Sequence, residues 1–270
     1  MHGRLLVITL VLCLAIPIPS RPQQSTSTTT TTSPQATTLL AQSSSALSGT
    51  TTVSDVTLSG TVQSIAGSDD ETGTVSLEAM APGESRMDLT LSASIRSEIR
   101  TFDANGNLIG AWSGSDGIQH PISYHNMLTD SSWFFPALTV SRLVSNSAEI
   151  ETYVGQETLN GQAVLHLSVS RPPSVAVTST PVIEHLSMMD FYLDPTTLLP
   201  VALMFTTHPD DNFLVDIPVQ ILFSDYQTIN GVQIPFHVQK FLNNSLLLDL
   251  QIQTAVLNSG LSPSGFGVSQ

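Results

Sequence analysis

Hairpin turns between runs of alternating apolar and polar residues restrict the fold of this sequence more than any other feature. The pair Asn230-Gly231 separates two such runs, at 225–229 and 232–235. Asn and Gly tolerate the positive φ angles that a two-residue β-hairpin turn requires. Asp194-Pro195 closes an earlier apolar strand that starts at Phe191. The last third of the chain is therefore predicted to be antiparallel sheet.

Residues 1–20 predict a secretory signal peptide. Arg4 gives a basic start, and the apolar run 5–19 that follows contains Thr9 as its one polar residue. This run is too short to cross a bilayer comfortably, although an uncleaved membrane anchor is the alternative. The single cysteine, Cys13, lies inside the run. Removal of the signal would leave a mature chain with no disulfide and no thiolate.

The rest of the chain divides by composition. Residues 21–38 are rich in Ser and Thr and carry no large apolar side chain, which predicts a disordered linker. A short helix is expected over 39–47, because its leucines follow helical spacing and Gly49 provides a stop. We expect one domain over 39–260 and a flexible tail over 261–270. A domain of about 220 residues can bury a sizeable core without disulfides.

The charge of the chain excludes some partners. Acidic residues outnumber basic ones by 22 to 8, and Lys240 is the only lysine. Binding to a phosphate backbone requires clustered Lys and Arg, so no nucleic-acid partner is expected. Attraction to anionic bilayers is disfavoured for the same reason, and any lipid contact would depend on apolar burial.

The middle of the chain interrupts the strand pattern. Alternation of period two starts at Val56, breaks between residues 121 and 144, and resumes at Ile150. The break is the most apolar part of the mature chain and suits one or two helices interrupted near Pro136. We predict an α+β, mainly β fold: a curved antiparallel half-barrel of about ten to eleven strands with a helical lid.

The lid supplies the predicted ligand-binding residues. Its aromatic and apolar side chains could contact an acyl chain, or they could simply fill the core, as large aromatic residues usually do. The predicted ligand-binding residues are Trp112, Met127, Leu128, Trp133, Phe134, Phe135 and Leu138.

Catalytic and metal-binding patterns are weak. Ser113-Gly114-Ser115-Asp116 only superficially resembles a nucleophile elbow, since no Gly-x-Ser-x-Gly sequence is present. His208, Asp210 and Asp211 lie close together, but a solvated turn explains them better than the ligand spacing of a metal site. We therefore predict no catalytic residue, no metal and no cofactor.

With these features, the chain resembles the LolA/LolB-like superfamily of periplasmic lipoprotein carriers. The similarity covers roughly residues 39–260 and follows the early helix, the meander and the mid-chain break. Its last part is carried by Phe191-Tyr-Leu-Asp194-Pro195, by Tyr226 with Asn230-Gly231-Val232, and by the closing strand 250–258. The resemblance implies an unclosed antiparallel half-barrel covered by helices. It also implies reversible binding of an acyl chain or another amphiphile between sheet and lid.

The sequence thus predicts an exported, periplasmic or secreted protein without enzymatic activity. We expect it to be a monomer that holds a lipid, an acyl chain or another amphiphile. A protein-interaction or envelope-sensing module on the same scaffold, with an envelope protein as partner, is the first alternative. An envelope hydrolase is the weaker one.

Overall fold

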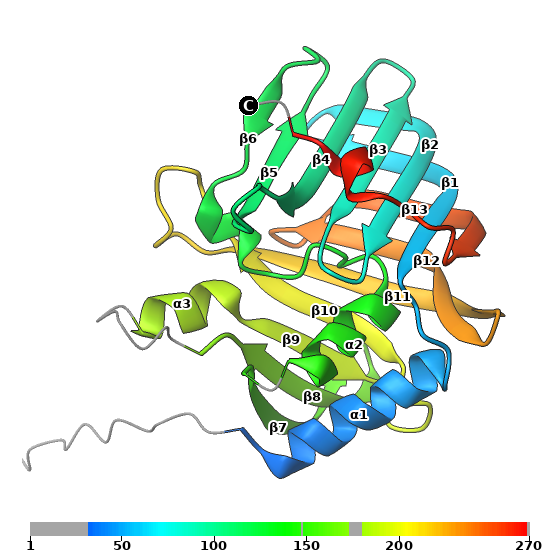
Figure 1. Cartoon of the computed structure of the whole chain (residues 1–270), viewed down its shortest axis with the longest axis vertical. Coiled ribbons are helices and arrows are strands. Elements are labelled where there is room, and N and C mark those ends of the chain that lie inside the picture. Colours follow the sequence, from blue (N-terminus) through cyan, green and yellow to red (C-terminus); the bar gives the residue numbers. More distant parts are fainter. Residues whose placement is uncertain (1–31, 147, 173–179, 269–270) are drawn as a thin grey trace, which may run out of the picture. The chain divides into compact units, whose positions relative to one another are not determined.

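The computed structural model describes residues 32–146, 148–172 and 180–268. The predicted signal peptide (1–20) and the first part of the predicted linker (21–31) lie outside the described residues. Within them, thirteen strands form one antiparallel sheet in the order β6-β5-β4-β3-β2-β1-β13-β12-β11-β10-β9-β8-β7 (Figure 1). The prediction of a mainly β chain with one antiparallel sheet is confirmed.

The strands follow one another along the chain as a meander, with β1 joined to β13 across the middle of the sheet. The first six strands are β1 (Asp55–Ala66), β2 (Asp69–Met80), β3 (Ser85–Leu91), β4 (Ile95–Phe102), β5 (Leu108–Ser113) and β6 (Gln119–Pro121). The other seven are β7 (Ile150–Leu159), β8 (Gln162–Ser170), β9 (Met189–Leu193), β10 (Pro200–Thr207), β11 (Ile217–Ile229), β12 (Val232–Leu242) and β13 (Ser245–Leu257).

Two Asn-Gly turns form hairpins, and one of them is the predicted turn at Asn230-Gly231. Asn230 and Gly231 have φ angles of 51° and 84° between β11 and β12. Asn160 and Gly161 have φ angles of 51° and 83° between β7 and β8. Positive φ at both positions gives the turn whose twist matches that of the flanking strands.

The predicted strand count of ten to eleven was too low. β6 covers only Gln119–Pro121, too few residues to show an alternating pattern. Helix α3 (Thr180–Ser187) precedes β9, which starts at Met189, two residues before the Phe191 at which the sequence predicts this strand to start. The Ser187 hydroxyl donates to the Ile183 carbonyl, 2.6 Å away, within the last turn of α3.

Helix α1 (Pro34–Ser48) starts five residues before the predicted Leu39, so residues 34–38 are helical and not part of a disordered linker. Ser33 is its N-cap, and Pro34 is in the first turn, where its missing N–H costs nothing. Gly49 ends the helix with φ 55°, as the sequence predicts. Burial of Ala36, Leu40, Ser43 and Leu47 explains the earlier start, since Ala36 extends the buried stripe by one turn.

The apolar mid-chain segment contains two helical pieces. A 3₁₀ helix, η1 (Tyr124–Met127), precedes helix α2 (Pro136–Ser145), and Pro136 starts α2 instead of interrupting it. Helices α1 and α2 pack on each other, and both contact β12 (Figure 1). Residues of both helices and of strands from β1 to β13 belong to one hydrophobic core. We call the face of the sheet that these helices cover the inner face.

Part of the predicted flexible tail over 261–270 is folded; residues 269–270 lie outside the described residues. A 3₁₀ helix, η2 (Pro263–Phe266), lies against β4, and the Phe266 side chain is 1% exposed. Arg86 Nη1 donates to the Gly265 carbonyl over 3.3 Å. A single large aromatic residue in an otherwise small and polar segment is enough to fix it on the sheet.

Candidate functional site

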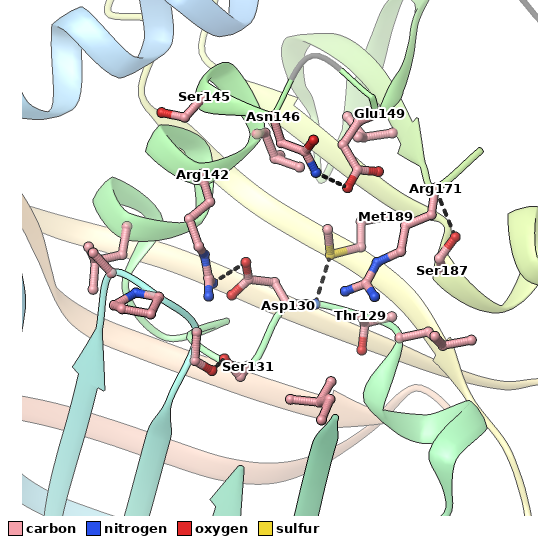
Figure 2. A pocket seen from close by; sticks show the side chains of 18 of the residues that line it. Thr129, Asp130, Ser131, Arg142, Ser145, Asn146, Glu149, Arg171, Ser187 and Met189 are labelled. Carbon is pink, nitrogen blue, oxygen red and sulfur yellow. Dashed lines mark hydrogen bonds and ion pairs between the residues drawn. The ribbon is translucent and has the colours of Figure 1, made fainter. Parts of the chain in front are cut away.

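A cavity of about 730 Å³ lies between α2, the start of β9 and the turns at the ends of β2 and β4. This volume is within the range typical of small-molecule sites. Part of its lining is apolar and comes from distant parts of the chain: Phe102, Leu108, Leu128, Leu138, Leu143, Val169 and Met189. Figure 2 shows the other part, which is polar and charged: Thr129, Asp130, Ser131, Arg142, Ser145, Asn146, Glu149, Arg171 and Ser187. The cavity is therefore amphipathic.

Asp130 and Arg142 form an ion pair at the α2 side of the cavity (Figure 2). Asp130 Oδ1 also accepts hydrogen bonds from the backbone N–H and the hydroxyl of Ser132, over 2.7 and 2.9 Å. Thr139 Oγ1 donates to the same oxygen over 3.3 Å. Arg142 Nη2 donates to Ser132 Oγ over 2.8 Å. The two charges thus neutralise each other within a hydrogen-bonded network, in which Arg142 Nε is buried without a hydrogen-bond partner among the described residues.

Glu149 lies at a second corner of the cavity, close to the start of β7. Asn146 Nδ2 donates to Glu149 Oε1 over 2.9 Å (Figure 2). Burial raises the pKa of Glu149, although the positive charge of Arg171 and the hydrogen bond from Asn146 act in the opposite direction. A carboxyl group held in this way disfavours a second negative charge beside it.

Arg171 follows directly after β8, and its side chain points into the cavity (Figure 2). Its backbone N–H donates to Ser187 Oγ over 2.9 Å, which ties the end of β8 to the end of α3. In the part of the chain that the structure describes, the guanidinium group forms no ion pair and no hydrogen bond. Among the described residues, Arg171 is thus the cation of this cavity whose guanidinium group is not hydrogen-bonded, with Glu149 as a nearby opposite charge.

The structure separates the predicted ligand-binding residues into two groups. Leu128 and Leu138 line the cavity. Trp133, Phe134 and Phe135 do not line it; like Leu138 they belong to the main hydrophobic core, and they are at most 3% exposed. Met127 is also buried, and its sulfur lies close to Gly110 on β5. For these residues, a role in ligand binding stays a prediction.

Trp112 lies apart from the cavity, on β5. Its side chain is 44% exposed and stacks on the His120 ring with centroids 4.4 Å apart. Cross-strand pairing places it on the same face of the sheet as Glu98 on β4. A role for Trp112 in ligand binding also stays a prediction, and it would require a surface outside the cavity.

Sequence reasoning missed the four charged residues of the cavity: Asp130, Arg142, Glu149 and Arg171. One signal was available. Arg142 is the lone charge between Leu138 and Val144, in the most apolar stretch of the chain, and such a charge needs a partner. The sequence did not indicate which partner, because Asp130 lies before the helix and Arg171 lies beyond β8.

A second charged cluster occupies the inner face between β4 and β12. Arg100 Nε pairs with Glu98 Oε1 over 3.0 Å, and Lys240 Nζ lies 4.5 Å from the centroid of the Trp133 ring. Burial lowers the pKa of Lys240, while the Glu98 carboxylate opposes this shift. Burial of Glu98 would raise its pKa, but the charges of Arg100 and Lys240 and the hydrogen bond from Arg100 outweigh it and lower the pKa. In this cluster the single carboxylate of Glu98 thus faces two basic side chains, Arg100 and Lys240.

The residues considered for metal binding have other partners. His208 Nδ1 lies 3.1 Å from the Val215 carbonyl, to which it can donate, and Ser123 Oγ donates to Asp210 Oδ1 over 2.8 Å. Among the residues that the structure describes, no group of three His, Cys, Asp or Glu side chains could hold a metal ion. A search of the same residues for a helix long and apolar enough to cross a membrane found none.

No protein-family model matches the sequence, and no curated protein matches it. Solved structures do match its fold. One is a domain from Vibrio parahaemolyticus named as an outer membrane lipoprotein-sorting protein, with a TM-score of 0.51 and 11% identity over 86% of this chain and 96% of that one. A DUF1329 family protein from Desulfovibrio piger gives a TM-score of 0.52 and 12% identity over 86% of this chain and 96% of that one.

A LolA superfamily protein from Nitrosomonas europaea also matches, with a TM-score of 0.48 and 9% identity over 86% of this chain and 97% of that one. Identities this low concern the fold alone. The two structures with the higher scores are covered over 96% of their length, so the match extends over nearly all of each of them. The chain therefore has a LolA-like fold, as the sequence resemblance implied.

Proposed function

We propose that this protein is an exported, non-enzymatic binding protein that holds a lipid, an acyl chain or another amphiphile in the cavity beside α2. The amphipathic lining carries this proposal. Leu138, Val169 and Met189 offer apolar surface for a chain, while Arg171 and Glu149 provide polar groups for a head group. Affinity would come from buried apolar area, at roughly 25 cal/mol per Å². The fold supports the same function, since one matching structure is named as a lipoprotein-sorting domain.

Native mass spectrometry of the protein purified from its own host under mild conditions tests this proposal directly. We expect a bound mass that lipid extraction resolves into acyl-chain species. An apo mass that does not change when single-chain amphiphiles are added would contradict the proposal. The protein-interaction module would then be the better reading, and the exposed run Phe213, Leu214 and Val215 would be the surface to examine.

A cavity-filling variant locates the bound molecule. Ser141 lines the cavity from α2 and is exposed, so Ser141→Trp should fill space without disturbing the core. We expect this variant to lose at least tenfold in affinity for dodecyl phosphate, because the indole occupies the volume that the chain needs. Ser45→Trp on the exposed side of α1 is the matched control.

Trp133 and Phe134 are unsuitable for the same test. They are 3% and 1% exposed within the core, so their truncation would cost about 3–5 kcal/mol of folding free energy each. Loss of binding in such a variant would not distinguish an empty cavity from an unfolded protein.

A further inference from the structure

The charged groups of the cavity differ in how many hydrogen bonds and ion pairs they form within the protein. Asp130 accepts from Ser132 and Thr139 and pairs with Arg142, so its carboxylate is already well bonded, whereas Arg142 Nε is buried without a hydrogen-bond partner among the described residues. Glu149 accepts from Asn146. Arg171 makes only the backbone hydrogen bond to Ser187 within the described residues. Among the described charged groups of the cavity, the guanidinium of Arg171 therefore has the largest unused donor capacity.

The chemistry of a guanidinium group defines what would fill this capacity. Arginine carries five N–H donors in a planar fork, and this geometry matches the paired oxygens of a carboxylate or a phosphate. Val169 and Met189 lie two residues from Arg171 and from Ser187, respectively, and they line the same cavity. An anionic group at Arg171 would thus have apolar surface next to it for the chain that it carries.

We propose that Arg171 binds the anionic head group, a carboxylate or a phosphate, of the amphiphile that occupies this cavity. This inference rests on the proposed function and narrows its ligand class. Glu149 lies in the same cavity and carries the opposite charge, so it weakens the binding of an anion. The two residues should therefore affect head-group preference in opposite directions.

Isothermal titration with probes of equal chain length tests the inference: dodecyl phosphate, dodecanoate, neutral dodecyl maltoside and, without a chain, inorganic phosphate. For the wild-type protein we expect the two anionic amphiphiles to bind at least tenfold more tightly than dodecyl maltoside. Inorganic phosphate should bind far more weakly, because it lacks the apolar chain. Tight binding of inorganic phosphate would contradict the inference that the ligand is an amphiphile. The site would then be one for a free anion.

Two variants that each remove one charge separate the contributions. Arg171→Gln should lose about tenfold or more in affinity for dodecyl phosphate and leave dodecyl maltoside unchanged. Glu149→Gln should bind dodecyl phosphate more tightly. Arg86→Gln is the matched control, because Arg86 pairs with Asp88 over 2.6 Å and does not line the cavity. Circular dichroism shows whether Arg171→Gln folds. If it does not fold, the affinities of Glu149→Gln and the head-group preference of the wild-type protein still test the inference.

The two proposals fail in different ways. Equal affinity for all three amphiphiles, with no effect of either variant, would overturn the head-group inference and leave the proposed function intact. No binding of any amphiphile would overturn the proposed function, and the head-group inference with it.

Discussion

At the scale of single residues, two histidines are expected to respond to pH in opposite directions. The His208 side chain is fully buried, with the His125 and His185 rings 5.9 and 6.0 Å away. Burial lowers the pKa of His208 below the ordinary 6.5, and the neighbouring rings add to this, although the Val215 carbonyl and Asp216 oppose it. As the pH falls, His208 therefore takes up a proton in the unfolded protein before it does so in the folded protein. The stability that neutral His208 contributes is lost below about pH 6.5.

His166 on β8 shows the opposite balance. Its Nδ1 lies 3.0 Å from Glu157 Oε1, and its Nε2 lies 3.2 Å from Asp190 Oδ1. Burial alone would lower the pKa of His166, but the hydrogen bonds and charges of Asp190 and Glu157 outweigh it and raise the pKa above 6.5. Protonated His166 therefore contributes stability below the unfolded value, and this contribution is lost as pH rises through the folded pKa.

Urea unfolding of His208→Gln and His166→Gln at about pH 7.5 and about pH 5.5 checks both signs. On acidification, the difference in free energy of unfolding between wild type and His208→Gln should shrink. The corresponding difference for His166→Gln should grow. If the difference in free energy of unfolding changed with the same sign for both variants, the opposite pKa shifts assigned to His208 and His166 would be contradicted.

At the scale of elements, the described chain after β13 is held by contacts with residues far away in the sequence, which the composition does not suggest. Asp55 accepts hydrogen bonds from the Ser259 and Gly260 backbone N–H groups, over 2.7 and 3.1 Å. Ser262 then caps η2, and Phe266 is buried against the sheet. The segment thus covers part of the outer side of β4 instead of extending into solvent.

Phe266→Ala should lower the free energy of unfolding by about 3 kcal/mol, because it empties a fully buried aromatic site. Chemical denaturation with far-UV circular dichroism measures the change. Phe213→Ala is the control, since Phe213 is 42% exposed and its loss should cost less than about 0.5 kcal/mol. Equal effects of the two substitutions would mean that η2 does not pack in solution.

At the scale of the whole described domain, the β1–β13 pair joins the two halves of the sheet. One hydrophobic core contains residues of strands on both sides of this pair, together with α1 and α2. The register of the pair shifts between Ser59 and Gly60. A Cβ at Gly60 would overlap the backbone carbonyl oxygen of Gln251, so this position permits only glycine without backbone movement.

Gly60→Ala should therefore destabilise the whole domain by about 2 kcal/mol, and not only one half of it. We expect one unfolding transition in both proteins, with tryptophan fluorescence and far-UV circular dichroism giving the same midpoint. Gly265→Ala, where a Cβ would meet nothing within 4 Å, is the control and should leave the midpoint unchanged. Separate transitions for the two probes would show that the halves unfold independently.

Local rules predicted much of the sheet from the sequence. The Asn160-Gly161 and Asn230-Gly231 turns, the alternating strands and the stop of α1 at Gly49 all depend on dihedral preferences of adjacent residues, which any sequence window displays. The boundaries at Pro34 and of η2 were missed, because a single buried side chain such as Ala36 or Phe266 decided each of them.

The sequence by itself thus determined a mainly β meander, a helical mid-chain segment and a LolA-like fold. Tertiary structure alone decided the thirteen-strand order, the burial of Trp133 in the core and the cavity in which Arg142 and Arg171 have different partners. The physical reason is distance along the chain. Turn geometry is fixed by neighbours, whereas the bonding state of Arg171 depends on residues that only the packing of α2 and α3 against the sheet brings together.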